Sequence, residues 1–321
     1  MKKGFKKILF ILIFVLIYLI FSYVFTAKEN IKKFGMYKTT SYDILTEKKD
    51  TVDVVIIGDS LVYSAIIPME IYKDYGFTVF DSADVSFLLQ DAYKHLEIAN
   101  ESQHPKIIMY ESNIFFRDIK NRPKIMEYKK TVKNHFPLLI NHTNWKKYLF
   151  SNDTENSWIN LSKGYRKNTA VQPIEKKEIK DKTSYIPQYN YESLEKAIKY
   201  CEKNNIKFVI LSIPSKLCYN DKRGKVVEDI AKKYNVDYIN VNTTDEVIID
   251  WQKETKDFGD HLNYYGAKKV SRYLGKRLAE YNMLEDHKKQ KKYKDWDKAL
   301  DYYIKDEKQE QSQLHIIRRA Q

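Results

Sequence analysis

From residue 51 onward, short apolar runs rich in β-branched residues alternate with stretches in which apolar residues recur at helical spacing. This alternation is typical of strands and helices that wind around a parallel sheet. The strand-like runs are residues 52–57, 77–80, 106–111, 208–212 and 238–241. The sequence therefore predicts an α/β protein whose open sheet has about five strands.

Helical periodicity fills the intervals between these runs. The interval between the second and third runs places its apolar residues on one helical face, namely Leu88, Leu89, Ala92, Leu96 and Ala99. Similar spacing predicts helices near residues 194–204 and 226–234, and a last helix after residue 263. We therefore expect residues 51–284 to form one domain.

Residues 117–187 interrupt the rhythm, since they are rich in lysine, asparagine and aromatic residues. We expect an inserted segment over the sheet. Its clustered aromatic residues are Trp145, Tyr148, Phe150 and Trp158. Such side chains more often form the core of a small insert than a binding surface, so no site residues are expected there.

The C-terminal residues 285–321 are highly charged. Five apolar residues nevertheless fall on one helical face: Tyr293, Trp296, Leu300, Tyr303 and Ile304. This pattern predicts a charged amphipathic C-terminal helix. Its apolar face could pack on its own domain, on a partner or on a membrane surface, and the sequence leaves the three open.

The N-terminal segment 1–27 has four lysines among its first seven residues and then an uncharged apolar run over residues 8–25. Such a run predicts a membrane-spanning helix. An uncleaved signal-anchor is favoured over a cleaved signal peptide, because Ser22, Thr26 and Ala27 do not make a convincing small-residue cleavage site. The lysines place the N-terminus in the cytoplasm. We expect a single-pass protein of the cell membrane, with residues 28–50 as a linker and the domain outside.

The formal net charge of +13 gives no evidence of nucleic-acid binding, because no dense basic run accompanies a base-reading module. For a domain outside a membrane, the excess of lysine better suits anionic partners such as lipid head groups or acidic cell-wall polymers. Cys201 and Cys218 could pair in an extracytoplasmic protein, although Cys201 is better explained as a small buried residue of a helix. No spacing of potential ligands predicts a metal site, and no cofactor is expected.

The motif Gly58-Asp59-Ser60-Leu61 follows the first strand-like run. In open parallel sheets, functional groups collect at the carboxyl ends of strands, which is where Ser60 is expected. A serine hydroxyl becomes a useful nucleophile only when a base accepts its proton. Ser60 is therefore the candidate nucleophile, against the alternative of an ordinary Gly-Asp-Ser turn.

A candidate base is His261, which follows two acidic residues on the loop before the last helix. An isolated loop histidine is usually solvated surface. His261, however, follows the last strand and has Asp257 and Asp260 close to it in sequence, which suits a general base.

These two motifs resemble the SGNH, or GDSL, hydrolase superfamily over about residues 52–281. The resemblance implies a three-layer, flavodoxin-like fold and a Ser-His-Asp triad. It also implies oxyanion donors from the serine amide, a glycine and an asparagine. Asn113, just beyond the third strand, is the matching asparagine, although a turn asparagine is an equal alternative.

Two blocks depart from the superfamily pattern. The third residue before His261 is Phe258 and not aspartate, so Asp257 or Asp260 has to orient the histidine, with a slight preference for Asp257. The glycine is also missing after the second strand. A backbone amide of Ser82 or Ala83 would have to replace it.

With the anchor, the chain is similar to bacterial surface proteins that act on acyl groups of envelope polymers, in teichoic acid D-alanylation and polysaccharide O-acetylation. The resemblance implies transfer of an O-acyl or D-alanyl group to such a polymer, and often a multi-spanning acyltransferase as partner. Two alternatives remain open. The protein could be an esterase that removes these groups, or a non-catalytic envelope-binding scaffold, which the two altered blocks would favour.

Overall fold

The computed structural model describes residues 2–26, 43–118, 120, 160–174 and 183–319. The chain divides into two units, Met1–Lys38 with Lys120–Asn160, and Thr39–Ile119 with Leu161–Gln321, and each is described by its described residues alone. Most of the predicted insertion at 117–187, including its four clustered aromatic residues, lies outside the described residues.

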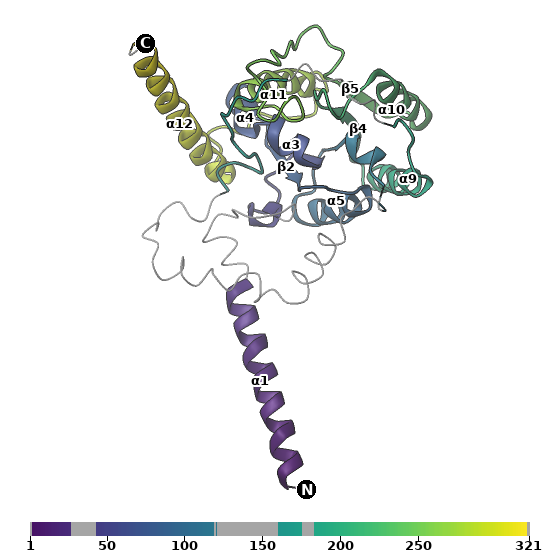
Figure 1. Ribbon diagram of the computed structural model, residues 1–321, viewed down its shortest axis with the longest axis vertical. Coiled ribbons are helices and arrows are strands. Elements are labelled where there is room, and N and C mark those ends of the chain that lie inside the picture. Colours follow the sequence, from purple (N-terminus) through teal and green to yellow (C-terminus); the bar gives the residue numbers. More distant parts are fainter. Residues whose placement is uncertain (1, 27–42, 119, 121–159, 175–182, 320–321) are drawn as a thin grey trace. The chain divides into compact units, whose positions relative to one another are not determined.

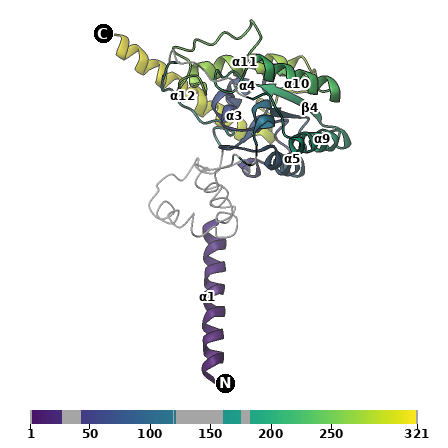
Figure 2. The same cartoon turned by 45° about the vertical axis from the view of Figure 1, so that its right-hand side comes forward.

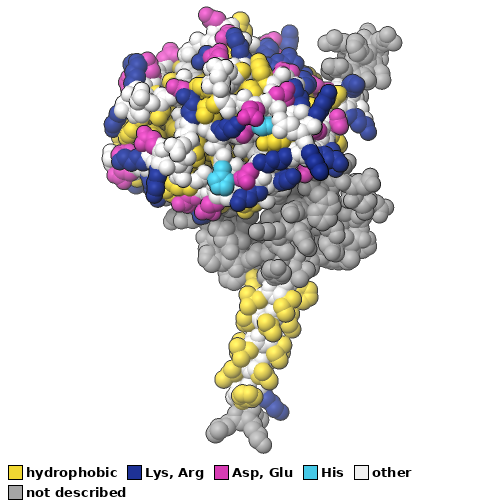
Figure 3. All heavy atoms as spheres, turned by 180° about the vertical axis from the view of Figure 1, so that it is seen from behind, with side chains coloured by type: hydrophobic (Ala, Val, Ile, Leu, Met, Phe, Trp, Pro, Cys, Tyr) yellow, Lys and Arg dark blue, Asp and Glu magenta, His cyan; other side chains and the backbone are white. Residues whose placement is uncertain are grey.

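In the first unit, the described structure includes helix α1, Lys2–Thr26. Its segment Gly4–Phe21 has a mean hydropathy of 2.4 and none of it is buried. Apolar side chains cover the visible face of this helix (Figure 3). By length and composition α1 can cross a membrane, as an N-terminal signal sequence also could.

The second unit contains a five-stranded parallel sheet in the order β2-β1-β3-β4-β5. The strands are β1 Val54–Gly58, β2 Val79–Ala83, β3 Ile107–Glu111, β4 Lys207–Ser212 and β5 Asp237–Asn240. This order is that of a flavodoxin-like doubly wound sheet, so the predicted fold class is confirmed. Every residue of β1, β2 and β3 is buried, as is expected where helices cover both faces.

Helices cover both faces of the sheet (Figures 1 and 2). On one face lie α3 Ser60–Ala65, α4 Pro68–Tyr75 and α11 Tyr264–Ala279; on the other lie α5 Leu89–Gln103, α9 Gln188–Lys203 and α10 Asp221–Tyr234. Short 3-10 helices occupy Asp43–Thr46, Ser112–Phe116 and Lys291–Tyr293. Alternate residues of a strand face opposite sides of the sheet. In β1, Val54 and Ile56 pack toward α3 and α11, while Val55 and Ile57 point the opposite way.

The predicted position of the second strand was wrong by two to three residues. The strand begins at Val79 and continues through Asp81, Ser82 and Ala83, which were expected to follow it as a loop. Polar residues are unusual in a buried strand, so this part of the strand could not be recognised from the sequence. Asp81 and Ser82 are nevertheless buried, and Ser82 Oγ is hydrogen-bonded to His95 Nδ1 at 3.1 Å. Burial raises the pKa of the Asp81 carboxyl well above its usual value, which favours its neutral form inside the sheet.

The C-terminal helix α12, Lys294–Arg319, packs its first half against α4. The Trp296 ring is buried 5.5 Å from that of Tyr72, centre to centre. Further along the helix, Tyr303 donates a hydrogen bond to the fully buried Glu70 at 2.6 Å. Glu70 also accepts from Arg272 of α11 at 2.7 Å. An apolar contact and a buried polar network therefore hold α12 on the domain.

Trp296→Ala is expected to lower the free energy of unfolding of the domain by about 3–5 kcal/mol, because it removes a large buried ring and leaves a cavity. Tyr302→Ala is the matched control, since Tyr302 lies on the same helix with 52% of its surface exposed. Chemical denaturation of the two variants and wild type measures the difference. Equal midpoints for all three proteins would contradict the packing described here.

Candidate active site

Ser60 lies at the switch point of the sheet. The chain runs from β1 to β2 at one side and then crosses back to β3 at the other side of β1, and such a reversal of strand order opens a crevice at the carboxyl ends of the strands. Ser60 is the first residue of α3, directly after this end of β1. Asp59 caps the helix, because its Oδ1 accepts a hydrogen bond from the Leu61 amide at 2.9 Å.

Gly58 is required by close packing. A Cβ atom at this position would lie 2.6 Å from both Glu111 Cβ and Val62 Cγ2. Glu111 is buried at the end of β3, and its Oε1 accepts from the Asn113 amide at 2.8 Å. Burial, with the adjacent Asp59, raises the pKa of Glu111 well above its usual value. The strand ends that carry Ser60 and Asn113 are thus in direct contact.

His261 is hydrogen-bonded to Ser60 across a sequence separation of 201 residues. Its Nε2 lies 2.7 Å from Ser60 Oγ, and its Nδ1 lies 2.6 Å from Asp257 Oδ2. Because the carboxylate can only accept at Nδ1, that nitrogen carries the proton and Nε2 accepts from the serine. This is the arrangement that a serine nucleophile and its base require.

The loop conformation explains why the carboxylate stands four residues before the histidine. Phe258 and Gly259 have positive φ angles of 59° and 94°, which turn the chain back on itself. The loop is closed by Thr255, whose hydroxyl donates to the His261 carbonyl and accepts from the Gly259 amide, both at 2.9 Å. In this turn Asp257 also accepts from the His261 amide at 2.6 Å. Phe258 is a turn residue here.

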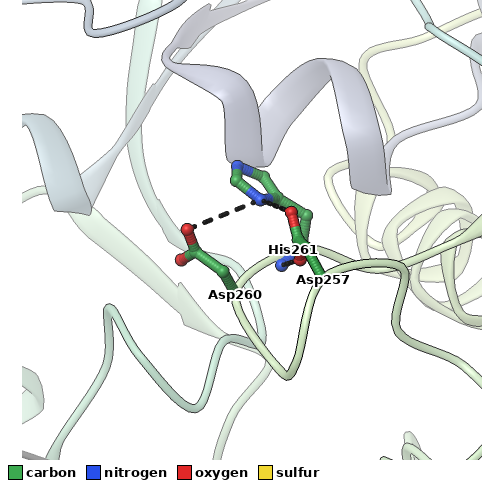
Figure 4. Close-up of side chains that lie close together, drawn as sticks. All are labelled: Asp257, Asp260 and His261. Carbon is green, nitrogen blue, oxygen red and sulfur yellow. Dashed lines mark hydrogen bonds and ion pairs between the residues drawn. The ribbon is translucent and has the colours of Figure 1, made fainter. Parts of the chain in front are cut away.

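Asp260 is placed less well to orient the histidine (Figure 4). Its Oδ2 is 3.6 Å from His261 Nδ1, and its Oδ1 accepts from the Cys218 thiol at 3.1 Å. Of the two candidates, the geometry favours Asp257. No disulfide joins Cys218 to Cys201, which is buried in α9.

The pKa of Asp257 is lowered from its usual value. Burial alone would raise it, but the hydrogen bonds from the His261 side chain and amide outweigh burial. Asp257 is therefore ionised at neutral pH, as an orienting carboxylate must be. Ligand atoms of Asp257, Asp260 and His261 lie within 4.8 Å of one another and could reach one metal ion. A metal on Nδ1 would displace the bond to Asp257, so these atoms suit a triad better than a metal site.

Asn113 is held between opposite charges. Its Nδ2 donates to Asp59 Oδ2 at 2.8 Å, and its Oδ1 accepts from Arg223 Nη1 at 3.0 Å. Asp59 also receives Arg117 Nε at 2.9 Å. Because a carboxylate only accepts and a guanidinium only donates, the Asn113 atom facing Asp59 is the nitrogen and the atom facing Arg223 is the oxygen. Asp59 takes one of the two Nδ2 hydrogens.

Ser82 and Ala83 lie on the strand next to the one that leads to Ser60. Ser82 pairs in register with Ile57 and directs its hydroxyl to His95, whereas Ala83 ends β2 opposite Gly58. Ala83 is therefore nearer to the carboxyl end of β1, which Ser60 follows. Arg117 and Arg223 could not be recognised as site residues from the sequence; Arg223, for example, reaches Asn113 from 110 residues away.

No family profile and no curated protein matches this sequence. Solved structures that are similar include a lipase/acylhydrolase from Enterococcus faecalis, with 9% identity over 71% of this chain and 96% of that one and a TM-score of 0.39. A GDSL-like lipase from Bacteroides thetaiotaomicron has 11% identity over 71% and 88%, with a TM-score of 0.36. A psychrotrophic esterase from Pseudoalteromonas sp. has 9% identity over 72% and 98%, with a TM-score of 0.39.

Proposed function

We propose that this protein is a serine esterase or acyltransferase of the SGNH type, with Ser60 as nucleophile, His261 as general base and Asp257 as the orienting carboxylate. The observation that carries the proposal is the continuous hydrogen-bonded chain from Ser60 Oγ through the His261 ring to Asp257, at 2.7 and 2.6 Å. It stands at the sheet's switch point, where open α/β sheets bind their ligands.

In the first half-reaction, Ser60 Oγ attacks the carbonyl carbon of an ester while His261 Nε2 takes the hydroxyl proton. The tetrahedral intermediate then expels the alcohol, which receives that proton from His261. The acyl group is left on Ser60. In the second half, a water or polymer hydroxyl gives its proton to His261 and attacks the acyl carbon. The second tetrahedral intermediate expels Ser60 Oγ, which takes the proton back from His261, and an acid or a new ester is released.

The oxyanion needs donors beside Ser60. The Ser60 amide is in the first turn of α3, where backbone N–H groups have no intrahelical acceptor. Asn113 supplies the second donor through its remaining Nδ2 hydrogen. The backbone near Ala83 is the third candidate, in place of the missing glycine.

Asn113→Ala is expected to lower kcat for an acetyl ester by about 10²–10³-fold with little change in KM, because an oxyanion donor acts mainly in the transition state. Steady-state kinetics separates the two constants. Asn100→Ala is the control, since Asn100 lies on α5 and its Nδ2 donates to the Tyr200 hydroxyl of α9. An unchanged kcat with a higher KM would instead assign Asn113 to substrate binding.

The acceptor that we favour is a hydroxyl group of a cell-envelope polysaccharide or teichoic acid, which makes the protein an envelope acyltransferase. The support is the apolar helix α1, consistent with a membrane anchor, and the net charge of +13, which suits an anionic polymer. A multi-spanning acyltransferase would supply the acyl group. Removal of acyl groups from the same polymers is the second candidate, since a hydrolase has the same triad.

Two experiments test this function. A fluorophosphonate should form a covalent adduct on the purified full chain, and mass analysis of its peptides should locate the adduct on Ser60. Absence of an adduct would favour the scaffold alternative. Envelope glycans from cells with wild type or Ser60→Ala then separate the acceptors: loss of acyl groups in the variant indicates transfer, and gain indicates hydrolysis.

A further inference from the structure

We propose that Arg166 and Lys256 form a binding site for an anionic group, a phosphate or a carboxylate, on the ester substrate of Ser60. The inference rests on the function proposed above and adds the substrate class. Both cations are held on the residues that follow Ser60 by one turn of α3, Tyr63 and Ser64.

Arg166 lies over the ring of Tyr63. Its guanidinium carbon is 4.1 Å from the ring centre, and its backbone amide donates to the Tyr63 carbonyl at 2.8 Å. Burial raises the pKa of the Tyr63 hydroxyl, while the neighbouring Arg166 and Ser60 oppose this rise. The guanidinium is exposed, so one ring separates an accessible cation from the nucleophile. Stacking on the ring leaves the edge of the guanidinium available to an anion.

Lys256 approaches from the loop that carries the histidine. Its Nζ donates to the buried Ser64 hydroxyl at 2.8 Å, and the residue directly precedes Asp257. Burial lowers the pKa of Lys256; Asp257 opposes this effect, while Arg166 adds to it. The two cations are therefore close enough to repel each other.

Within the described part of the chain, neither Arg166 nor Lys256 forms an ion pair with a carboxylate. Asp257 is bound to His261 and Asp260 to the Cys218 thiol. The neighbouring Lys167 differs, since it forms ion pairs with Asp306 and Glu310 of α12. Two adjacent cations beside a nucleophile raise the local potential and attract an anionic ligand.

The ligand chemistry follows from the two side chains. A guanidinium binds two oxygens of a phosphate or carboxylate at once, and an ammonium adds a point charge. Because the ester carbon must touch Ser60 Oγ, the anionic group has to lie within a few bonds of the ester. A phosphate-linked polymer and an acidic sugar both meet this requirement, so the test has an arm for each.

The test compares three acetyl esters with the detergent-solubilised full chain: 1-O-acetylglycerol, its 3-phosphate, and O-acetylglycerate. We expect kcat/KM for at least one anionic ester to exceed that for the neutral ester by about 10-fold or more, as for one charge-assisted contact. Arg166→Gln with Lys256→Gln should bring this ratio to about one. A preference for the phosphate or for the glycerate identifies the source of the anion.

Lys253→Gln is the matched control, because the Lys253 side chain is 81% exposed on the same loop, paired with Asp250. It should keep the wild-type ratio. A wild-type ratio of one, in a protein that fluorophosphonate labels at Ser60, would overturn the anion site and leave the serine chemistry intact. If the protein is not labelled, calorimetric binding of glycerol 3-phosphate to wild type and the double variant decides: equal affinities overturn the site.

Discussion

Ser60→Ala is expected to lower kcat/KM toward an activated acetyl ester by about 10⁴-fold or more and to abolish the fluorophosphonate adduct. The loss is large because the triad acts as a unit, and without the serine oxygen no acyl-enzyme forms. The Ser60 hydroxyl is hydrogen-bonded to His261, and neither residue is fully buried. Its removal should therefore leave the fold intact, which circular dichroism and the denaturation midpoint check.

Ser193→Ala is the control for this substitution. Ser193 lies on α9, where its hydroxyl donates to the Tyr189 carbonyl of the same helix at 2.8 Å. The control should keep wild-type turnover and labelling. If Ser60→Ala retained more than about a tenth of the wild-type rate, the proposed nucleophile would be wrong.

Asp257→Asn is expected to lower kcat by about 10³–10⁴-fold, whereas Asp260→Asn should lower it by less than about 10-fold. An asparagine at 257 can present an N–H to Nδ1 and so favour the wrong imidazole tautomer. Asp260 is 3.6 Å from the same nitrogen and has the Cys218 thiol as its partner. Single-turnover kinetics of the two variants, which differ by three positions on one loop, compares them directly.

The pH dependence provides a second readout of the same pair. The pKa of Asp257 is lowered by the hydrogen bonds from His261, after they outweigh burial, so the carboxylate persists below the usual range of an aspartate. Its contribution to stability is present above the unfolded pKa and is lost as the pH falls through the lowered folded pKa. Asp257→Asn should therefore reduce the loss of stability at acidic pH, which denaturation midpoints measured over a pH series would show. Reversed effects of the two substitutions would assign the orienting role to Asp260.

The sequence predicts most of the sheet because four of its strands are short runs of apolar residues with few polar interruptions. The second half of β2 could not be predicted, since Asp81 and Ser82 resemble a loop until His95 provides a buried partner. Strand existence thus follows from local pattern, and the exact bounds depend on contacts that are distant in sequence.

The candidate site divides in the same way. Ser60 and His261 stand out locally, each by its position after a strand and its neighbours. The choice between Asp257 and Asp260 needed the positive φ of Phe258 and Gly259, which no residue pattern indicates for phenylalanine. The contact of Arg223 with Asn113 and that of Arg166 with Tyr63 arise only when separate segments meet.

The docking of α12 has a consequence for the timing of synthesis. Lys167, next to Arg166, is paired with Asp306 and Glu310 near the end of the chain, and Lys163 lies over the Trp296 ring. The hydrogen-bond partner of Ser60, His261, lies 201 residues later in the chain. A nascent chain therefore emerges with Ser60 lacking its histidine partner and with Lys167 lacking its two carboxylates. The hydrogen-bonded chain of Ser60, His261 and Asp257 can form only after most of the chain has left the ribosome.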